Sequence, residues 1–187
     1  ANGCKAEGQI TIVVKQPLQI HIPDTVFTCL GNEVAICSDG YGGTSINDYV
    51  FTWSNGFVSD SSATSCQIVN ETATTEHRVI LSDGCSVPDT AFIDVVVYPI
   101  PVPSFSALEN RGCPPFNTVF TSSASLANCT FSWDMDGNGT QDTTASLFNW
   151  TYYNSGVFDV ILTVTSPEGC ESEMAIPQYI TVYPDPI

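Results

Sequence analysis

Apolar and polar residues alternate along several short stretches of this chain, and β-branched or aromatic residues dominate the apolar positions. Gly, Asn, Asp, Ser or Pro bound each stretch, which is typical of β-strands that end in turns. No stretch combines the 3.6-residue spacing of an amphipathic helix with capping residues. We therefore expect strands at residues 9–14, 33–36, 49–53, 77–81, 91–97, 158–164 and 178–182.

These strands recur in a repeat of about eighty residues. A Gly-Cys pair, a β-branched strand and a proline follow one another three times, at residues 3–17, 84–99 and 169–184. The cysteines of the three pairs are 81 and 85 residues apart, and a Phe-x-Trp motif at 51–53 returns 80 residues later at 131–133. Short strands in units of this length predict tandem β-sandwiches.

Proline-rich segments separate the repeats. Residues 98–103 are Tyr-Pro-Ile-Pro-Val-Pro, and residues 183–186 are Tyr-Pro-Asp-Pro. Because proline fixes φ and favours extended backbone, we expect short, stiff links. The predicted fold is all-β, with β-sandwiches at 18–102 and 103–187, and with residues 1–17 as the terminal strand or strands of an upstream, truncated repeat.

The charge balance excludes some partners. Lys and Arg total 4, Asp and Glu total 20, and the formal net charge is -16. So few cations cannot neutralise a phosphate backbone, and an anionic membrane surface would repel the chain. We therefore expect no nucleic-acid binding. The apolar run 92–97 is interrupted by Asp94, so we also expect no membrane insertion.

Eight cysteines without zinc-site spacing indicate disulfides, and hence an exported protein in an oxidising compartment. Cys29 and Cys113 hold the same place in two repeats, 56 and 57 residues before the Gly-Cys cysteines Cys85 and Cys170. This spacing predicts the disulfides Cys29–Cys85 and Cys113–Cys170, each of which would close a long loop.

The other four cysteines do not follow the repeat. Cys37 and Cys66 belong only to the middle repeat and are predicted to form a second bridge there; two buried free thiols are the alternative. Cys4 and Cys129 have no evident mate, and both are left unpaired.

The last repeat resembles the PKD domain, a seven-stranded immunoglobulin-like sandwich. Residues 131–142 (Phe-Ser-Trp-Asp-Met-Asp-Gly-Asn-Gly-Thr-Gln-Asp) and 152–164 (Tyr-Tyr-Asn-Ser-Gly-Val-Phe-Asp-Val-Ile-Leu-Thr-Val) carry the resemblance, which covers about 103–184. Asn-Trp-Thr at 149–151 departs from the family pattern, and the middle repeat is more divergent. The Gly-Cys-Pro-Pro opening at 112–115 is similar to tandem modules of large cell-surface proteins from gliding and adhesive Bacteroidetes, the SprB-like gliding adhesins.

One glycine-bent loop gathers oxygen ligands of the kind that calcium prefers. Its candidate ligands are Asp134, Asp136, Asn138, Thr140 and Asp142. The bidentate Glu that a calcium loop carries at its twelfth position is absent. The alternative is a polar turn in which Asp and Asn side chains cap their own backbone.

Catalysis has little support in the sequence. His21 and His77 lie in different strand-like stretches and are interpreted as structural. The carboxylates fall in turns of separate small repeats, without a large cleft to hold a substrate, and we expect no enzyme activity. Trp53 and Trp133 are interpreted as core residues rather than as sugar-stacking platforms.

Two weaker sites complete the candidates. The long, flexible loop at 38–48 presents Tyr41 and is a candidate ligand loop; a plain glycine-rich connector is the alternative. Thr25, Thr90 and Thr143 each follow an Asp, and in the Bacteroidetes resemblance such threonines are O-glycosylation sites.

These features lead to one hypothesis with two alternatives. We expect a non-enzymatic structural or adhesive segment of a long extracellular cell-surface protein or filament, with a role in gliding implied by the resemblance. Its partners would be neighbouring repeats of the same chain, surface polysaccharide or other cell-surface proteins. The alternatives are an accessory binding module of a secreted hydrolase, and a filament subunit whose strand at 9–14 completes another molecule.

Overall fold

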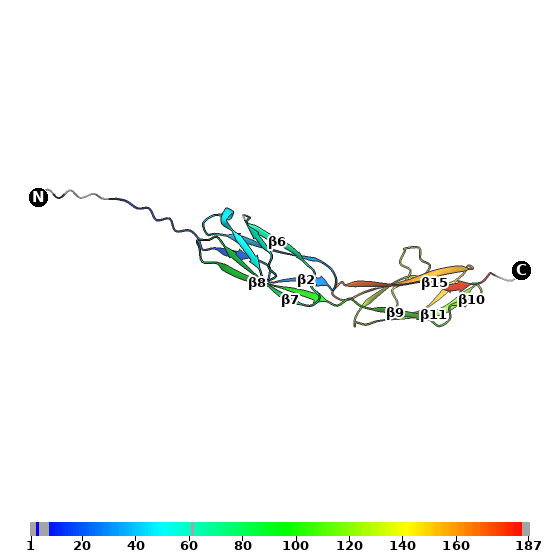
Figure 1. Ribbon diagram of the computed structural model, residues 1–187. Coiled ribbons are helices and arrows are strands. Elements are labelled where there is room, and N and C mark those ends of the chain that lie inside the picture. Colours follow the sequence, from blue (N-terminus) through cyan, green and yellow to red (C-terminus); the bar gives the residue numbers. More distant parts are fainter. Residues whose placement is uncertain (1–2, 4–7, 61, 185–187) are drawn as a thin grey trace. The chain divides into compact units, whose positions relative to one another are not determined.

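Figure 1 shows the computed structural model, which describes residue 3 and residues 8–60 and 62–184. The chain forms two compact units, unit 1 (Ala1–Val97) and unit 2 (Tyr98–Ile187). Each unit is an immunoglobulin-like β-sandwich, so the predicted tandem all-β fold is confirmed. The only helix in the described residues is a single 3₁₀ turn, η1 (Ile46–Asp48), and no described helix is long and apolar enough to cross a bilayer.

Unit 1 packs a three-stranded sheet against a five-stranded sheet. The first sheet has the order β1 (Gln19–His21), β3 (Val34–Tyr41) and β6 (Thr64–Val69). The second has the order β2 (Thr25–Cys29), β8 (Asp89–Tyr98), β7 (Thr75–Ser82), β4 (Val50–Trp53) and β5 (Val58–Asp60).

Unit 2 repeats this plan with four strands facing three. The first sheet has the order β10 (Arg111–Gly112), β15 (Glu171–Val182), β14 (Gly156–Thr165) and β12 (Thr130–Asp134). The second has the order β13 (Leu147–Tyr152), β11 (Phe116–Ala124) and β9 (Pro103–Ala107). The short β10 pairs with β15 in parallel, whereas the other pairings in this unit are antiparallel.

The alternation of apolar and polar residues places each core between its two sheets. Along β14, Val160, Leu162 and Val164 are fully buried while the residues between them are partly exposed. This period of two is what a strand with one buried face requires. Trp53 anchors the core of unit 1 and Trp133 that of unit 2, with exposed fractions of 2% and 0%, so their assignment to the core is confirmed.

Residues 9–14 are the one predicted strand that the structure does not contain. Residues 8–17 are extended without strand pairing, and Ile10, Ile12, Val13 and Val14 are 71–87% exposed. A β-branched alternating sequence needs a neighbouring strand to accept its hydrogen bonds. Within the described part of the chain, no strand supplies that edge.

The predicted bridge Cys37–Cys66 is confirmed. The two cysteines are direct partners in the β3–β6 ladder, with a Cα–Cα distance of 4.1 Å. They lie on the outer face, because Ile36 and Ser38 on either side of Cys37 point into the core. Cys129 is free, as expected, and Cys4 lies outside the described residues.

The predicted bridge Cys29–Cys85 is wrong. Cys85 is an exposed free thiol, whereas Cys29 is disulfide-bonded. The Cys29 carbonyl accepts a hydrogen bond from the N–H of Asn32, just before β3 begins. The N–H of Cys85 donates to Asp83, and the same carboxylate accepts the N–H of Thr44, which lies just after β3 ends. Cys29 and Cys85 therefore lie near opposite ends of β3. The eight residues of β3 span about 26 Å, which is far beyond the Cα separation of roughly 7 Å that a disulfide tolerates.

The predicted bridge Cys113–Cys170 is wrong for the same reason. Cys113 is an exposed free thiol, and Cys170 is disulfide-bonded. Cys170 immediately precedes β15, while Cys113 follows Gly112, which pairs with Val182 at the other end of β15. The twelve residues of β15 separate the two cysteines by about 40 Å. Sequence spacing identified equivalent positions correctly but could not show that they lie at opposite ends of a sandwich.

Candidate functional site

The acidic loop that follows β12 is organised around one carboxylate. Asp134 is 9% exposed, and its Oδ1 accepts backbone N–H groups of Asp136, Gly137 and Asn138 at 3.2, 2.8 and 3.2 Å. Its Oδ2 accepts the N–H of Gly139 at 2.7 Å. The backbone curls round the carboxylate because Gly137 and Gly139 adopt φ values of 74° and 82°, which favour glycine.

Electrostatics keep this carboxylate ionised. Burial would raise the pKa of Asp134, but the four N–H donors together outweigh it and hold the pKa below the usual value. Beneath the loop, the Tyr152 hydroxyl donates to the Met135 carbonyl at 2.9 Å, and Asp142 Oδ2 accepts the Met135 N–H at 2.7 Å. Burial, followed by the charges of Asp142 and Asp136, raises the pKa of Tyr152.

The loop brings together the carboxylates singled out for calcium. One oxygen from each of Asp134, Asp136 and Asp142 lies within 4.8 Å of the others. Asn138 Oδ1 is already an acceptor for the backbone N–H of Thr140 at 2.8 Å and for its hydroxyl. The loop is thus closed by its own hydrogen bonds, as in the polar-turn alternative, and its two exposed carboxylates remain the groups most open to a cation.

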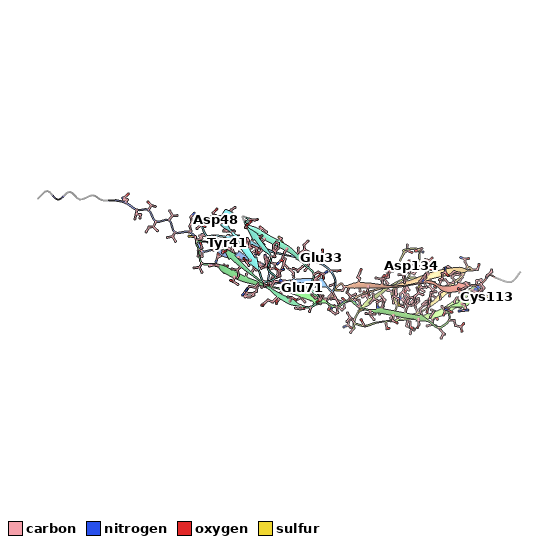
Figure 2. The ribbon with its side chains drawn as sticks, viewed as in Figure 1. Glu33, Tyr41, Asp48, Glu71, Cys113 and Asp134 are labelled. Atoms are coloured by element: carbon pink, nitrogen blue, oxygen red, sulfur yellow. A yellow bond between two sulfur atoms is a disulfide. The ribbon has the colours of Figure 1, made fainter. Side chains whose placement is uncertain are left out.

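Hydrogen bonds hold the loop that presents Tyr41, which corrects the expectation that this candidate ligand loop is flexible. Tyr41 ends β3 with 48% of its surface exposed. Just beyond it, the Tyr49 hydroxyl donates to the Gly42 carbonyl at 2.7 Å, and Thr44 donates its N–H and hydroxyl to Asp83. Figure 2 shows Tyr41 and Asp48 together at one end of unit 1.

Asp83 is a structural residue that the sequence analysis missed. Its Oδ1 accepts the N–H groups of Cys85 and Ser86 at 3.1 and 2.6 Å, and its Oδ2 accepts the Ser86 hydroxyl at 2.8 Å. These donors, led by the Ser86 N–H, hold the pKa of this carboxyl far below its ordinary value despite burial. An Asp two residues before Cys in a Gly-containing turn was the available signal.

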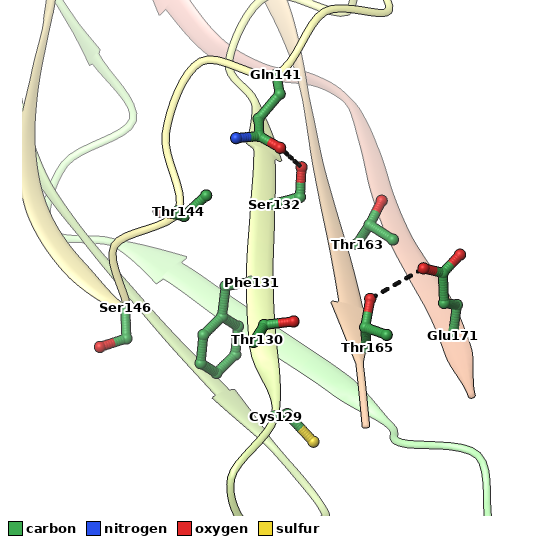
Figure 3. A pocket seen from close by; sticks show the side chains of 10 residues that line it. All are labelled: Cys129, Thr130, Phe131, Ser132, Gln141, Thr144, Ser146, Thr163, Thr165 and Glu171. Atoms are coloured by element: carbon green, nitrogen blue, oxygen red, sulfur yellow. Dashed lines mark hydrogen bonds between the residues drawn. The ribbon is translucent and has the colours of Figure 1, made fainter. Parts of the chain in front are cut away.

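A second missed feature is an open groove of about 790 Å³ that crosses β12 and reaches Thr163 and Thr165 on β14 and Glu171 on β15 (Figure 3). Hydroxyl groups line it, and two of them are fixed: Ser132 donates to Gln141 at 3.0 Å, and Thr165 donates to Glu171 at 3.1 Å. Cys129 lies at one end of the groove. Such a row of hydroxyl and carboxylate groups suits a polar, hydroxyl-rich ligand.

The two histidines hold structural positions. His77 is 3% exposed, and its Nε2 lies 3.0 Å from Glu71 Oε1. His21 is exposed in the edge strand β1, where it is paired in register with Asp39. The interpretation of both as sheet residues agrees with these placements.

The core tryptophans have their ring N–H groups satisfied. Trp53 Nε1 donates to the Ser65 hydroxyl at 2.9 Å, and Trp133 Nε1 donates to the Ala145 carbonyl at 3.0 Å. A buried indole with a bonded N–H serves packing and offers no face for stacking on a sugar.

The candidate glycosylation threonines differ in access. Thr90 is exposed on β8, whereas Thr25 and Thr143 are half-buried. The structure thus brings the acidic-loop residues into one cluster and leaves these threonines dispersed.

Neither a known family profile nor a curated protein sequence matches the chain. Among solved structures, the chain is similar to the I-band fragment I67-I69 from titin, with 11% sequence identity and a TM-score of 0.48. The match covers 90% of this chain and 66% of the titin fragment, so the chain spans just under two thirds of the fragment's length. It is also similar to Sidekick-1 immunoglobulin domains 1-5, with 14% identity and a TM-score of 0.46, over 90% of this chain and 39% of that chain. The fibronectin(III)-like modules of Clostridium thermocellum CbhA are similar too, with 12% identity and a TM-score of 0.45, over 89% of this chain and 95% of that chain. These are similarities of fold, and neither an activity nor a partner follows from them.

Proposed function

We propose that this chain is a non-enzymatic structural and adhesive segment of a long extracellular cell-surface protein built from such modules. One observation carries the proposal: the same terminal-strand pattern occurs three times. Its copies after Gly84 and Gly169 form β8 and β15, the last strand of each unit. The first copy, at 3–17, precedes β1, the first strand of unit 1. Its residues Ile10, Ile12, Val13 and Val14 are exposed, as expected of a last strand whose own module lies upstream.

The disulfides support an extracellular setting, and the net charge suits an array of separate modules. Cys37–Cys66 is a disulfide on the outer face of unit 1, and Cys29 and Cys170 are also disulfide-bonded. Disulfides persist in oxidising compartments. A net charge of -16 would also keep neighbouring modules from collapsing on one another.

The non-enzymatic part rests on how the ionisable groups are used. His77 is bonded to Glu71, while Asp83 and Asp134 each hold several backbone N–H groups. A catalytic acid or base must be able to exchange its proton with a substrate. These three side chains instead fix loops and strand ends.

The proposed partners are surface polysaccharide or other cell-surface proteins, in addition to neighbouring modules. The hydroxyl-lined groove along β12 and the exposed Tyr41 are the surfaces that these partners would contact.

Calcium is retained as the proposed ligand of the acidic loop. Backbone N–H groups already occupy much of the Asp134 carboxylate. The exposed carboxylates of Asp136 and Asp142 would therefore provide most of the calcium binding, and the affinity is expected in the weak range of extracellular modules. The PKD assignment, the Bacteroidetes origin and the gliding role belong to the same proposal.

An antibody raised against the chain tests the proposal on source cells. We expect a polypeptide much larger than this chain on immunoblots, and its loss when intact cells are briefly treated with protease. A cytoplasmic protein detected on the same blots serves as the control for intact cells. A band that resists protease on intact cells and disappears only after lysis would contradict the extracellular assignment.

The same experiment separates the alternatives. A secreted band that co-purifies with polysaccharide- or protein-degrading activity would favour an accessory module of a hydrolase. A band of this chain's own size that assembles into polymers would favour the strand-exchanging subunit, for which the exposed segment 9–14 would be the donor. Either outcome would replace the adhesin proposal.

A further inference from the structure

Two cysteines occupy matching positions in the hairpins that precede the last strands. Cys85 follows Gly84 before β8, and Cys170 follows Gly169 before β15. Both glycines have positive φ, 71° and 85° respectively, so the two turns are built alike. We name Cys85 and Cys170 the hairpin cysteines.

Two other cysteines match at the opposite end of each sandwich. In unit 2, Cys113 follows β10, which runs parallel to β15 and ends level with Val182. In unit 1, the chain before Cys29 runs parallel to β8. The Ile20 N–H donates to the Asp89 side chain at the start of β8, and the Asp24 carbonyl accepts the Asp94 N–H further along β8. We name Cys29 and Cys113 the strand-end cysteines. Figure 2 shows Cys113 at the end of unit 2 where β15 finishes.

Each class has one bonded and one free member. The strand-end Cys29 and the hairpin Cys170 are disulfide-bonded, whereas the strand-end Cys113 and the hairpin Cys85 are free and exposed. The same position is therefore bonded in one unit and free in the other. A simple surface thiol would not show this pattern, because its counterpart in the sister unit would be free as well.

We propose that Cys85 and Cys113 are cross-linking sites for further modules of the same type, each taking a partner of the other class. This rests on the proposed array. Cys85 would bond to the strand-end cysteine of the module before it, and Cys113 to the hairpin cysteine of the module after it.

The direction of the last strand explains why unlike classes pair. Each module finishes at its strand-end cysteine, because β8 and β15 run away from the hairpin cysteine. The chain enters a module beside the start of its last strand, as the bond between Ile20 and Asp89 shows. In an array with links as short as residues 99–102, the strand-end cysteine of one module would face the hairpin cysteine of the next. Four linking residues reach at most about 17 Å.

The bond forms by thiol–disulfide exchange with a disulfide oxidant such as oxidised glutathione. The Cys113 thiolate attacks the oxidant, forms a mixed disulfide and releases one reduced thiol. The thiolate of the hairpin cysteine then attacks the Cys113 sulfur and releases the second. Two protons and two electrons leave the cysteine pair, and the oxidant takes up both electrons.

Differential alkylation of the parent protein on intact source cells tests the bonds. We expect Cys85 and Cys113 to resist iodoacetamide until a reductant is added, while Cys129 reacts without it in denaturant and serves as the free-thiol control. Non-reducing peptide mapping should find the Cys113 peptide joined to a Gly-Cys peptide. Alkylation of Cys85 and Cys113 without reductant would overturn the proposal.

Recombinant full-length chain tests the pairing rule without the parent protein. In a background of Cys4→Ser and Cys129→Ser, the single variants Cys85→Ser and Cys113→Ser should each stay monomeric in a glutathione redox buffer. Their equimolar mixture should give a reducible dimer. Equal homodimer formation by either single variant, or no dimer in the mixture, would overturn the rule. This result does not depend on where the parent protein is found, so it is separate from the surface-protease test of the proposed function.

Discussion

Asp83 Oδ2 accepts both the N–H and the hydroxyl of Thr44, at 2.8 and 3.0 Å, although the two residues are 39 positions apart. This pair ties the loop after β3 to the hairpin before β8. Thr44 follows β3 of the three-stranded sheet, and Asp83 follows β7 of the five-stranded sheet. The contact therefore closes one end of the unit 1 sandwich. It also explains why the glycine-rich segment beside Tyr41 has a defined conformation.

We predict that Asp83→Asn lowers the melting temperature of unit 1 by about 5 °C. The amide keeps the size of the side chain but loses the charge and half of the acceptor capacity that five donors use. Thermal unfolding followed by circular dichroism measures the change. Asp60→Asn, at an exposed position in β5, is the matched control and should leave the midpoint unchanged.

The same variant should alter the acid sensitivity of the protein. The pKa of Asp83 is lowered by folding, so its stabilising contribution is complete above the ordinary value of 3.8 and is lost as the pH falls toward the folded-state pKa. Wild-type protein should therefore lose more stability than Asp83→Asn between about pH 5 and about pH 2. Urea titrations at the two pH values give the difference. An identical loss in both proteins would show that this carboxylate does not contribute.

Cys37→Ser should destabilise unit 1 by about 3–4 kcal/mol, the chain-entropy value for a closed loop of this size. The bridge spans 29 residues and joins adjacent strands on the outer face, so its removal leaves little cavity. Chemical denaturation under non-reducing conditions provides the measurement.

Cys85→Ser and Cys113→Ser are the informative controls for that prediction. Both thiols are exposed and free, so neither substitution should change the stability of the isolated chain by more than about 0.5 kcal/mol. A loss as large as that of Cys37→Ser would restore the disulfides that the sequence spacing predicted.

The extent to which the sequence predicted the fold can be judged from these cysteines. Periodicity identified β3, β4, β7, β8, β14 and the end of β15, because burial of alternate residues leaves a direct pattern in the sequence. It missed other core strands, among them β11, whose Phe116 and Phe120 are buried. The repeat also placed Cys29 with Cys113 and Cys85 with Cys170 correctly. Pairing failed because a disulfide depends on distance in space, and a whole strand separates the two cysteines within each repeat.

The acidic loop was predictable for a different reason. Asp134, Asp136 and Asp142 are close in sequence, so a glycine-bent turn was enough to bring their oxygens together. Asp83 was missed because its partner Thr44 is remote in sequence and comes near only after the two sheets have packed. The groove along β12 was missed because it exists only where an edge strand, a hairpin and a neighbouring strand meet.

Trp133→Ala should cost unit 2 about 3–5 kcal/mol of unfolding free energy, because the ring is fully buried between the sheets. It packs edge-on against Phe105, Phe120 and Phe148 with ring centroids 5.1–5.7 Å away. Trp150→Phe is the control, since Trp150 is half-buried on β13 and the substitution keeps an aromatic ring. Denaturant unfolding that shows equal losses for both variants would contradict the core assignment.

Asp134→Ala should destabilise unit 2 both with calcium and with chelator, because the lost bonds are to the loop's own N–H groups. Calcium binding, by contrast, should depend on Asp136 and Asp142, whose carboxylates are exposed. Raising calcium to several times a millimolar dissociation constant should lift the wild-type midpoint by a few degrees through mass action. The double variant Asp136→Asn, Asp142→Asn should lose that rise and keep its midpoint in chelator. A wild-type midpoint that is the same in calcium and in chelator would remove the ion and leave Asp134 as the single organiser of the loop.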